Sequence, residues 1–238
     1  MSVFVIADLH LATADSDKSM EVFGNRWKNY IQKIRTNWQA VVTPEDTVVI
    51  PGDISWGLAT EDALEDLLWL EELPGRKIIM KGNHDFWWST VSKLNAFFEK
   101  HNISSIDILN NNALEAENYI IAGSRGWFTD KTMQNVDGNV DYGKIINRET
   151  IRLKMSLDSA VKLKERTNKE IVVFLHFPPV WSDFVCEPII ALLKEYNISR
   201  CYFGHIHGNY SQPDRFQYDS IDFFMISADF LNFIPKII

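Results

Sequence analysis

The chain has 238 residues and a formal net charge of −8, with 46% hydrophobic and 24% charged residues. Its length and composition are those of a globular protein, and we expect one α/β domain over residues 1–238. The negative charge argues against a broad surface for nucleic acid or an anionic membrane, because both need a basic face. The negative net charge does not exclude an anionic substrate, since bound divalent metals can make the local electrostatic potential positive.

The cysteines and the N-terminal segment bear on the compartment. Cys186 and Cys201 form neither a disulfide framework nor a C-x-x-C metal pair. The segment from Met1 to Ala7 has no basic region and too short an apolar run for a secretory signal. No stretch reaches the roughly 18 apolar residues of a membrane span. We therefore expect a cytoplasmic protein with reduced thiols and no membrane segment.

Short apolar runs rich in β-branched residues alternate with helix-length segments. In chain order the pattern predicts a strand at Val3–Ala7, a helix at Arg26–Ala40, a strand at Thr47–Ile50, a helix from an N-cap at Thr60 to Leu73, a strand at Lys77–Met80, a helix at Ser89–Lys100, a strand at Tyr119–Ala122, a helix at Ile145–Thr167, a strand at Ile171–Leu175, a helix at Pro188–Tyr196 and a strand at Arg200–Phe203. This alternation favours βα units and a largely parallel sheet. The tail Arg215–Ala228 predicts added antiparallel strands, and the polar stretch Thr129–Gly143 is a candidate lid.

Side chains that bind metals follow five of the predicted strands directly, and they include five of the six histidines. In chain order they are Asp8 and His10, then Asp53, then Asn83 with His84 and Asp85, then His176, and finally His205 and His207. In open α/β sheets, sites form beyond the carboxyl ends of the strands. We therefore expect these side chains to meet in space.

The residue types indicate the kind of ion. Carboxylate, imidazole and amide ligands suit manganese, iron, zinc, cobalt or nickel, and the absence of cysteine excludes a thiolate cluster. Seven potential ligands exceed the needs of one catalytic ion and suit two ions that share a carboxylate. Gly52, Gly82 and Gly204 are expected to let the backbone turn sharply at the strand ends and to bring the ligands inward. Each of these five segments alone could instead be a turn, a helix cap or a histidine of the core. Together and in this order, the five segments favour a metal site.

The ordered set resembles the signature of the calcineurin-like metallophosphoesterases. The motifs that carry the resemblance span residues 8 to 207, and none of the ligand positions is substituted: Asp8-x-His10, Gly52-Asp53, Gly82-Asn83-His84-Asp85, His176 and Gly204-His205-x-His207. The resemblance implies a four-layer α/β/β/α sandwich with a dinuclear metal site at the C-terminal ends of the strands. By analogy, the first ion is bound by Asp8, His10 and His207, the second by Asn83, His176 and His205, and Asp53 bridges the two.

Such a centre predicts a hydrolase that cleaves a small or medium phosphate ester by metal-activated hydroxide attack. His84, next to a ligand, is expected to act as general acid on the leaving group, and Asp85 to orient its ring. Arg125 follows the strand Tyr119–Ala122 and can fork onto a phosphate, or alternatively serve loop packing. Three tryptophans, Trp56, Trp87 and Trp88, are candidates for a cleft wall, with burial in the core as the alternative.

Several functions share these motifs. A phosphodiesterase and a phosphomonoesterase use the same ligands, and related folds act as nucleases or protein phosphatases. Cleavage of long duplexes would need a basic track, which the scattered Lys and Arg do not provide. The non-enzymatic alternative is a metal-binding scaffold, as in the retromer subunit of this fold. A scaffold is free to lose ligands, whereas this chain retains all seven and His84.

Overall fold

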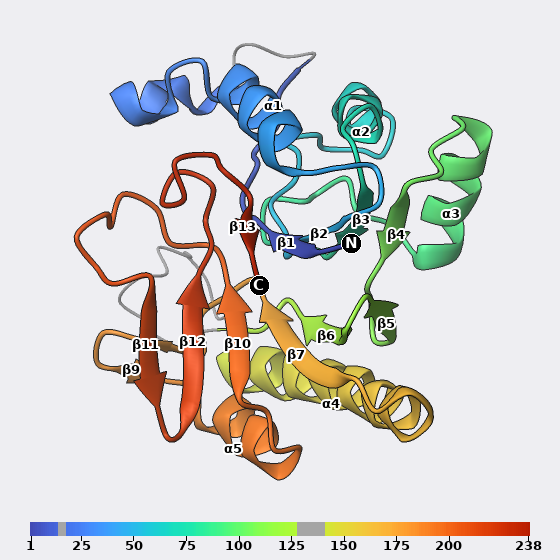
Figure 1. Ribbon diagram of the computed structural model, residues 1–238. Helices are drawn as coiled ribbons and strands as arrows, with labels where there is room; N and C mark the ends of the chain where they lie inside the picture. Colours follow the sequence, from blue (N-terminus) through green and yellow to red (C-terminus); the bar gives the residue numbers. More distant parts are fainter. Residues whose placement is uncertain (14–17, 128–140) are drawn as a thin grey trace.

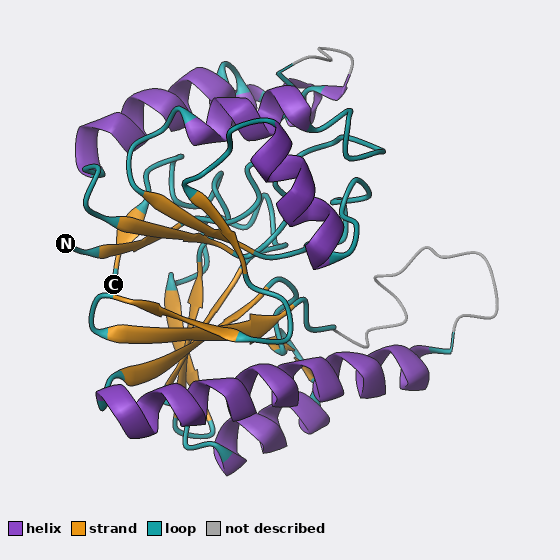
Figure 2. Ribbon diagram, turned by 90° about the vertical axis from the view of Figure 1, so that its right-hand side faces the viewer, coloured by secondary structure: helices purple, strands orange, loops and turns teal. Residues whose placement is uncertain are grey.

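A computed structural model describes residues 1–13, 18–127 and 141–238. Two β-sheets lie face to face, and helices cover the outer side of each sheet (Figure 2). The expected α/β/β/α sandwich is therefore confirmed. Of the candidate lid, residues 129–140 lie outside the described residues, and its last three residues belong to the start of a long helix.

The first sheet has the strand order β13-β1-β2-β3-β4. Four parallel strands form it, β1 (Val3–Val5), β2 (Thr47–Ile50), β3 (Arg76–Ile79) and β4 (Ile106–Ile108), and β13 (Lys236–Ile237) pairs antiparallel with β1. Three helices pack on its outer face, α1 (Tyr30–Val41), α2 (Leu64–Glu71) and α3 (Val91–Lys100), and two 3-10 helices precede α1, η2 (Met20–Phe23) and η3 (Asn25–Trp27) (Figure 1).

The second sheet has the order β11-β12-β10-β7-β6-β5. Its four central strands are parallel, β12 (Ile221–Met225), β10 (Arg200–Phe203), β7 (Glu170–Leu175) and β6 (Tyr119–Ser124), and its edges are antiparallel, β11 (Arg215–Tyr218) and β5 (Ala113–Ala116). Its outer face carries α4 (Tyr142–Thr167) and α5 (Glu187–Glu195), and a short hairpin precedes α5, β8 (Val180–Trp181) with β9 (Phe184–Val185).

The inner strands are buried on both faces, which explains their continuous apolar sequences. Val5, Ile78 and Phe174 belong to the core between the two sheets. The sheets also join directly, because the chain just past β1 bonds to the chain just past β12. The amide of Ala7 donates to the carbonyl of Ile226 (2.8 Å), and the amide of Ala228 donates to the carbonyl of Ala7 (2.9 Å). This junction brings Asp8 to the edge that both sheets share.

The six predicted strands and the antiparallel tail are confirmed, with differences of a residue or two at the ends. Five short strands, β4, β5, β8, β9 and β13, were not predicted, because runs of two to four residues carry little periodic signal. The predicted N-cap at Thr60 is wrong. Helix α2 begins at Leu64, and the hydroxyl of Thr60 instead donates to the carbonyl of Trp87 at 2.9 Å.

Both cysteines are buried and neither forms a disulfide. Burial raises the pKa of the Cys186 thiol, which makes it a poor nucleophile at neutral pH. Among the helices of the described ranges, none is long and apolar enough to cross a membrane. The single-domain expectation for residues 1–238 stays a prediction.

One lysine in β3 departs from the apolar pattern of the inner strands. The side chain of Lys77 is 1% exposed, and its ammonium donates to the carbonyls of Leu73 (2.6 Å) and Gly75 (3.0 Å) and to the hydroxyl of Ser105 (2.7 Å). Burial lowers the pKa of Lys77 to about 8, and the charge of Glu71 opposes this shift. The lysine thus joins the segment after α2 to the loop before β4.

Lys77→Met should destabilise the fold. The substitution leaves three carbonyls and a hydroxyl without this donor, those of Glu71, Leu73, Gly75 and Ser105. We therefore expect the free energy of unfolding to fall by about 3 kcal/mol. Urea unfolding followed by circular dichroism measures this loss. The matched control is Lys93→Met on the exposed face of α3, which should change stability by less than about 0.5 kcal/mol. Equal stability of the two variants would contradict the role of Lys77.

Candidate metal centre

The seven predicted ligands come from the ends of β1, β2, β3, β7 and β10 and meet at the edge that the two sheets share. Six of them form two groups in which the potential ligand atoms lie within 4.8 Å of one another: Asp8, His10 and His207 in one, and Asp53, His176 and His205 in the other. The seventh, Asn83, joins the second group, since its Oδ1 lies 2.6 Å from Nε2 of His176. The structure thus brings together all seven.

The carboxylate of Asp53 lies between the two groups. Its Oδ2 is 3.6 Å from Nε2 of His10, in the first group, and 3.5 Å from Nε2 of His176, in the second. Within the first group, Nε2 of His10 and Nε2 of His207 are 3.3 Å apart. Imidazole nitrogens that point at one another and at a carboxylate are arranged as ligands around a common cation.

Four of the predicted ligands have a strained backbone. The φ angles of Asp8 (60°), His10 (46°), Asp53 (53°) and His205 (71°) lie in the left-handed region, which costs roughly 1–3 kcal/mol for each such residue. Strain of this kind persists only where the surrounding structure enforces it, and it clusters at functional sites. Four of the fifteen non-glycine residues with positive φ in the described chain are thus candidate ligands.

The nearby glycines are needed for close approach more than for turning. Gly52 has a positive φ of 101°, as expected of a sharp turn. Gly82 and Gly204 lie outside the left-handed region, so a positive φ is not the reason for glycine at these two positions. A Cβ on Gly82 would lie 2.1 Å from Oδ1 of Asp53, and one on Gly204 would lie 2.6 Å from Oδ2 of Asp8. Any side chain there would displace a candidate ligand.

Asp85 has a different role from the predicted one. Its buried carboxylate accepts hydrogen bonds from the amides of Asp53 (2.8 Å), Ile54 (2.8 Å) and Gly82 (2.7 Å), and from the indole of Trp87 (3.0 Å). Both oxygens are engaged in this way, so Asp85 ties the loop after β2 to the loop after β3. The expectation that Asp85 orients the ring of His84 is therefore corrected, because its acceptors face backbone donors.

The electrostatics of the centre favour a bound cation. Burial raises the pKa of Asp8 to about 6, although His207 opposes the shift. Burial and the neighbouring Asp85 and Asp8 raise the pKa of Asp53 well above its usual range. Burial and nearby imidazoles lower the pKa of His205 to about 3. Within the described residues, Oδ1 of Asp8 is buried without a hydrogen-bond partner. A divalent cation would stabilise the carboxylates and use the neutral imidazoles as ligands, so the donor set fits one.

Sequence reasoning missed Asp229, which holds one of the candidate ligands in place. Its fully buried carboxylate accepts from Nδ1 of His207 (2.8 Å), from the amide of Gly208 (3.1 Å) and from the hydroxyl of Tyr210 (3.0 Å). Burial by itself would lower the pKa of His207, but this bond and the charge of Asp8 raise it. The bond also turns Nε2 of His207 toward the centre. The sequence did offer a sign of this residue, because Asp229 is an acidic residue shortly after a strand, as Asp8 and Asp53 are.

His84 and Trp56 lie at the border of the centre. The amide of His84 donates to Oδ1 of Asp53 at 2.8 Å, and the ring is half-buried. The ring of Trp56 is 4.5 Å from that of His84 and stacks on His10 at 4.9 Å, measured between ring centroids. Trp56 therefore lies beside two rings of the candidate centre and also packs against the core of the first sheet. Trp87 is buried in the core, and Trp88 lines a separate cavity.

Arg125 has contacts both in a loop and in a cavity. Its carbonyl accepts from the amides of His176 (3.1 Å) and Phe177 (2.9 Å), which is a loop-packing role. Its guanidinium lines the cavity that also contains Trp88 and lies 3.4 Å from Glu149. Substrate binding by Arg125 stays a prediction at this point.

The fold and the sequence define the class. The model of the calcineurin-like phosphoesterase family matches residues 1–209, so the chain belongs to this family of metal-dependent hydrolases that act on phosphate esters. The predicted membership is thereby confirmed, and the two groups of acidic and imidazole side chains are its candidate metal sites.

Solved structures with the same fold include the protein TT1561 of Thermus thermophilus, with a TM-score of 0.60 and 10% identity over 96% of this chain and 89% of that one. Another is the protein of unknown function AQ665 from Aquifex aeolicus, with a TM-score of 0.53 and 18% identity, over 99% of this chain and 95% of that one. Among curated relatives, the Gene 66 protein of Mycobacterium phage D29 is 36% identical over 84 residues, 35% of this chain and 40% of that protein. The chain thus matches less than half the length of its curated phage relatives.

Asp229→Asn should weaken metal binding. The amide keeps the shape of the side chain but removes the charge that holds the ring of His207, so we expect Mn²⁺ affinity to fall by about 10- to 100-fold. Competition with a chromogenic chelator measures the dissociation constant. Asp214→Asn, on an exposed carboxylate paired with Lys236, is the matched control and should leave the affinity unchanged. Unaltered affinity in Asp229→Asn would show that this carboxylate does not support the centre.

Proposed function

We propose that the chain is a phosphoesterase with a dinuclear centre, which hydrolyses a small or medium phosphodiester or phosphomonoester. The observation that carries the proposal is the position of Asp53, whose Oδ2 lies within 3.6 Å of an imidazole nitrogen of each ligand group. We assign the first ion to Asp8, His10 and His207, the second to Asn83, His176 and His205, and the bridge to Asp53. Manganese, iron, zinc, cobalt and nickel all suit this donor set.

When bound, two such ions supply the Lewis acidity that lowers the pKa of a water nucleophile and offsets the charge of the phosphate. The chain's own residues do the rest. Asp85 fixes the loops that carry Asp53 and Asn83, and Asp229 holds the ring of His207. Trp56 covers one side of His10 and limits the access of water to it.

His84 is the proposed general acid. Its amide is bonded to Asp53, which ties its backbone to the bridging position, while its ring packs on Trp56 at the border of the centre. A half-buried imidazole at this place can donate a proton to the alkoxide that leaves. The contact with Trp56, in place of the predicted contact with Asp85, fixes the orientation of the ring.

Two alternatives find less support. A scaffold has no need of a complete ligand set with strained backbone at four ligand positions, and strain without a use is a cost to stability. A nuclease for long duplexes would need a basic track over several turns of the helix, whereas the net charge is −8.

Removal and return of metal tests the proposal. Protein stripped by a chelator and given Mn²⁺ should hydrolyse bis-p-nitrophenyl phosphate or p-nitrophenyl phosphate, and the faster of the two indicates diester or monoester preference. Asp53→Asn should lower kcat by at least about 100-fold, because it removes the bridge. The control Asp158→Asn, on the exposed face of α4, should keep full activity. If protein shown by elemental analysis to hold two metals hydrolyses neither compound, the proposal of a phosphoesterase is contradicted.

His84→Ala tests the general acid. The loss of kcat should be about 100-fold or more for an ester with an alkyl leaving group, which needs a proton, and much smaller for a p-nitrophenyl ester. The matched control is His101→Ala, since His101 packs on Phe97 after α3, away from the centre. An equal loss with both esters would assign His84 to substrate binding or structure, and no loss with the alkyl ester would remove it from catalysis.

A further inference from the structure

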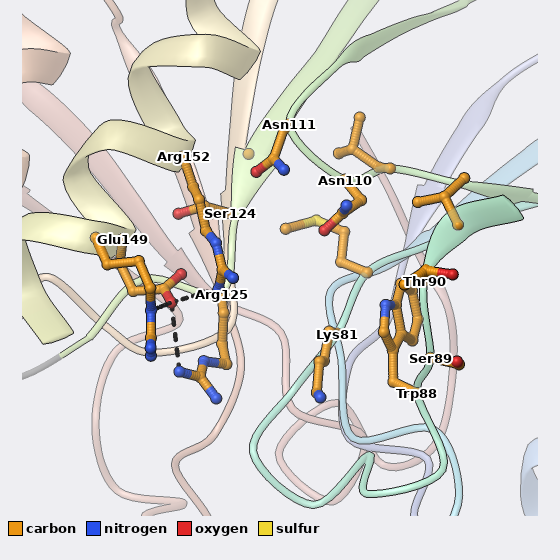
Figure 3. A pocket seen from close by; sticks show the side chains of 15 residues that line it. Lys81, Trp88, Ser89, Thr90, Asn110, Asn111, Ser124, Arg125, Glu149 and Arg152 are labelled. Atoms are coloured by element: carbon orange, nitrogen blue, oxygen red, sulfur yellow. Dashed lines mark hydrogen bonds and ion pairs between the residues drawn. The ribbon is translucent and has the colours of Figure 1, made fainter. Parts of the chain in front are cut away.

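A second cavity, of about 500 Å³, opens beside the candidate metal centre, and Figure 3 shows the side chains that line it. Its walls come from the ends of β3 and β6, the start of α3 and one side of α4. Two lining residues share their backbone with the centre. Lys81 stands two residues before Asn83, and the carbonyl of Arg125 accepts from the amide of His176 at 3.1 Å. A molecule in this cavity would therefore be next to one that reacts at the centre.

The lining is strongly cationic in a chain that is acidic overall. It contains the four cations Lys81, Arg125, Arg148 and Arg152, and Glu149 is the single acidic residue that lines it in the described part of the chain. Oε1 of buried Glu149 receives all three guanidinium groups, at 2.8 Å from Arg152, 3.4 Å from Arg125 and 3.5 Å from Arg148. One carboxylate neutralises one of these charges, so the lining keeps an excess of positive charge.

Some donors in this cavity remain unused. Nε of Arg125 is buried and has no hydrogen-bond partner within the described residues. On the opposite wall, Ser89, Thr90 and Val91 bring the N-terminus of the ten-residue helix α3 to the cavity. No side chain of the described ranges caps that end at Thr90, so the first-turn amides add a partial positive charge. Figure 3 shows Arg125, Glu149 and Arg152 on one side of the opening, with Lys81, Trp88 and Thr90 facing them.

The lining holds more cations than Glu149 needs as partners. If the arginines served only to neutralise Glu149, one of them would suffice.

We propose that this cavity, which we call the cationic pocket (Lys81, Arg125, Arg148 and Arg152), binds a second phosphate group of the substrate. The inference rests on the proposed phosphoesterase function for the group that is cleaved, and it narrows the substrate to esters that carry another phosphate. Guanidinium groups on one wall and helix amides on the opposite wall can donate the several hydrogen bonds that phosphate oxygens accept. The volume leaves room for the organic part that joins the two groups, beside the ring of Trp88.

Binding without metal tests the pocket independently of catalysis. Chelator-treated protein is titrated with inorganic pyrophosphate in a calorimeter. We expect measurable binding to the native chain and an affinity at least about tenfold lower in Arg152→Gln and, from the opposite wall, in Lys81→Gln. Arg166→Gln, in the last turn of the same helix as Arg152, is the matched control and should bind as the native chain does. Absence of binding to the native chain, or equal affinity in all variants, would overturn the proposal.

Inhibition by nucleotides with one or two phosphate groups tests whether the cationic pocket binds the second phosphate. Adenosine bisphosphate should inhibit hydrolysis of bis-p-nitrophenyl phosphate by the Mn²⁺-loaded protein about tenfold more strongly than adenosine monophosphate, and Arg152→Gln should remove the difference. Equal inhibition by both nucleotides in the native chain would overturn the proposal. Pyrophosphate binding that depends on Arg152 in a protein without hydrolytic activity would contradict the proposed function and support the pocket. Hydrolysis with pyrophosphate binding that is insensitive to the variants would contradict the pocket alone.

Discussion

The burial of two carboxylates, Asp8 and Asp53, among four imidazole rings is the constraint on which the rest of this structure depends. Desolvation favours the neutral form of every one of these groups, and among them it is outweighed only at His207, where the hydrogen bond to Asp229 and the charge of Asp8 raise the pKa. Without a cation, the cluster therefore needs support from the surrounding chain. The strained loops, the close glycines and the hydrogen bonds of Asp85 and Asp229 are the features that provide it.

These supports come from different levels of the fold. The strand ends give each loop its starting direction, and the junction at Ala7 aligns the two sheets. Gly82 and Gly204 allow the carboxylates to lie against the main chain of a neighbouring loop. Asp85 then binds the amides of two loops at once, which fixes the distance between their ligands. Each support acts at a position where a displacement of about one ångström would disturb the geometry of the ligands.

The sequence predicted the sandwich and the convergence of the candidate ligands, because both follow from general rules on parallel strands. The division of the ligands between two ions came from the family resemblance, and the geometry is consistent with it. The rest depends on contacts that no local pattern encodes. Lys77 stands in a predicted strand and Asp85 was expected to orient its neighbour His84. Arg148 and Arg152 fall within a predicted helix, which gives no sign of a shared partner. Only the packed fold brings backbone donors to Asp85 and places those arginines around one buried glutamate.

The junction between β1 and β12 has a consequence for the order in which the centre assembles during synthesis. Asp8, His10, Asp53 and Asn83 leave the ribosome with the first sheet, long before His176, the two later histidines and Asp229. The early half is acidic and lacks most of its imidazoles, and its edge stays open until the chain after β12 returns to Ala7. Domains generally fold from the N-terminus as they emerge. The candidate centre is therefore complete only when the chain after β12 closes on the chain after β1.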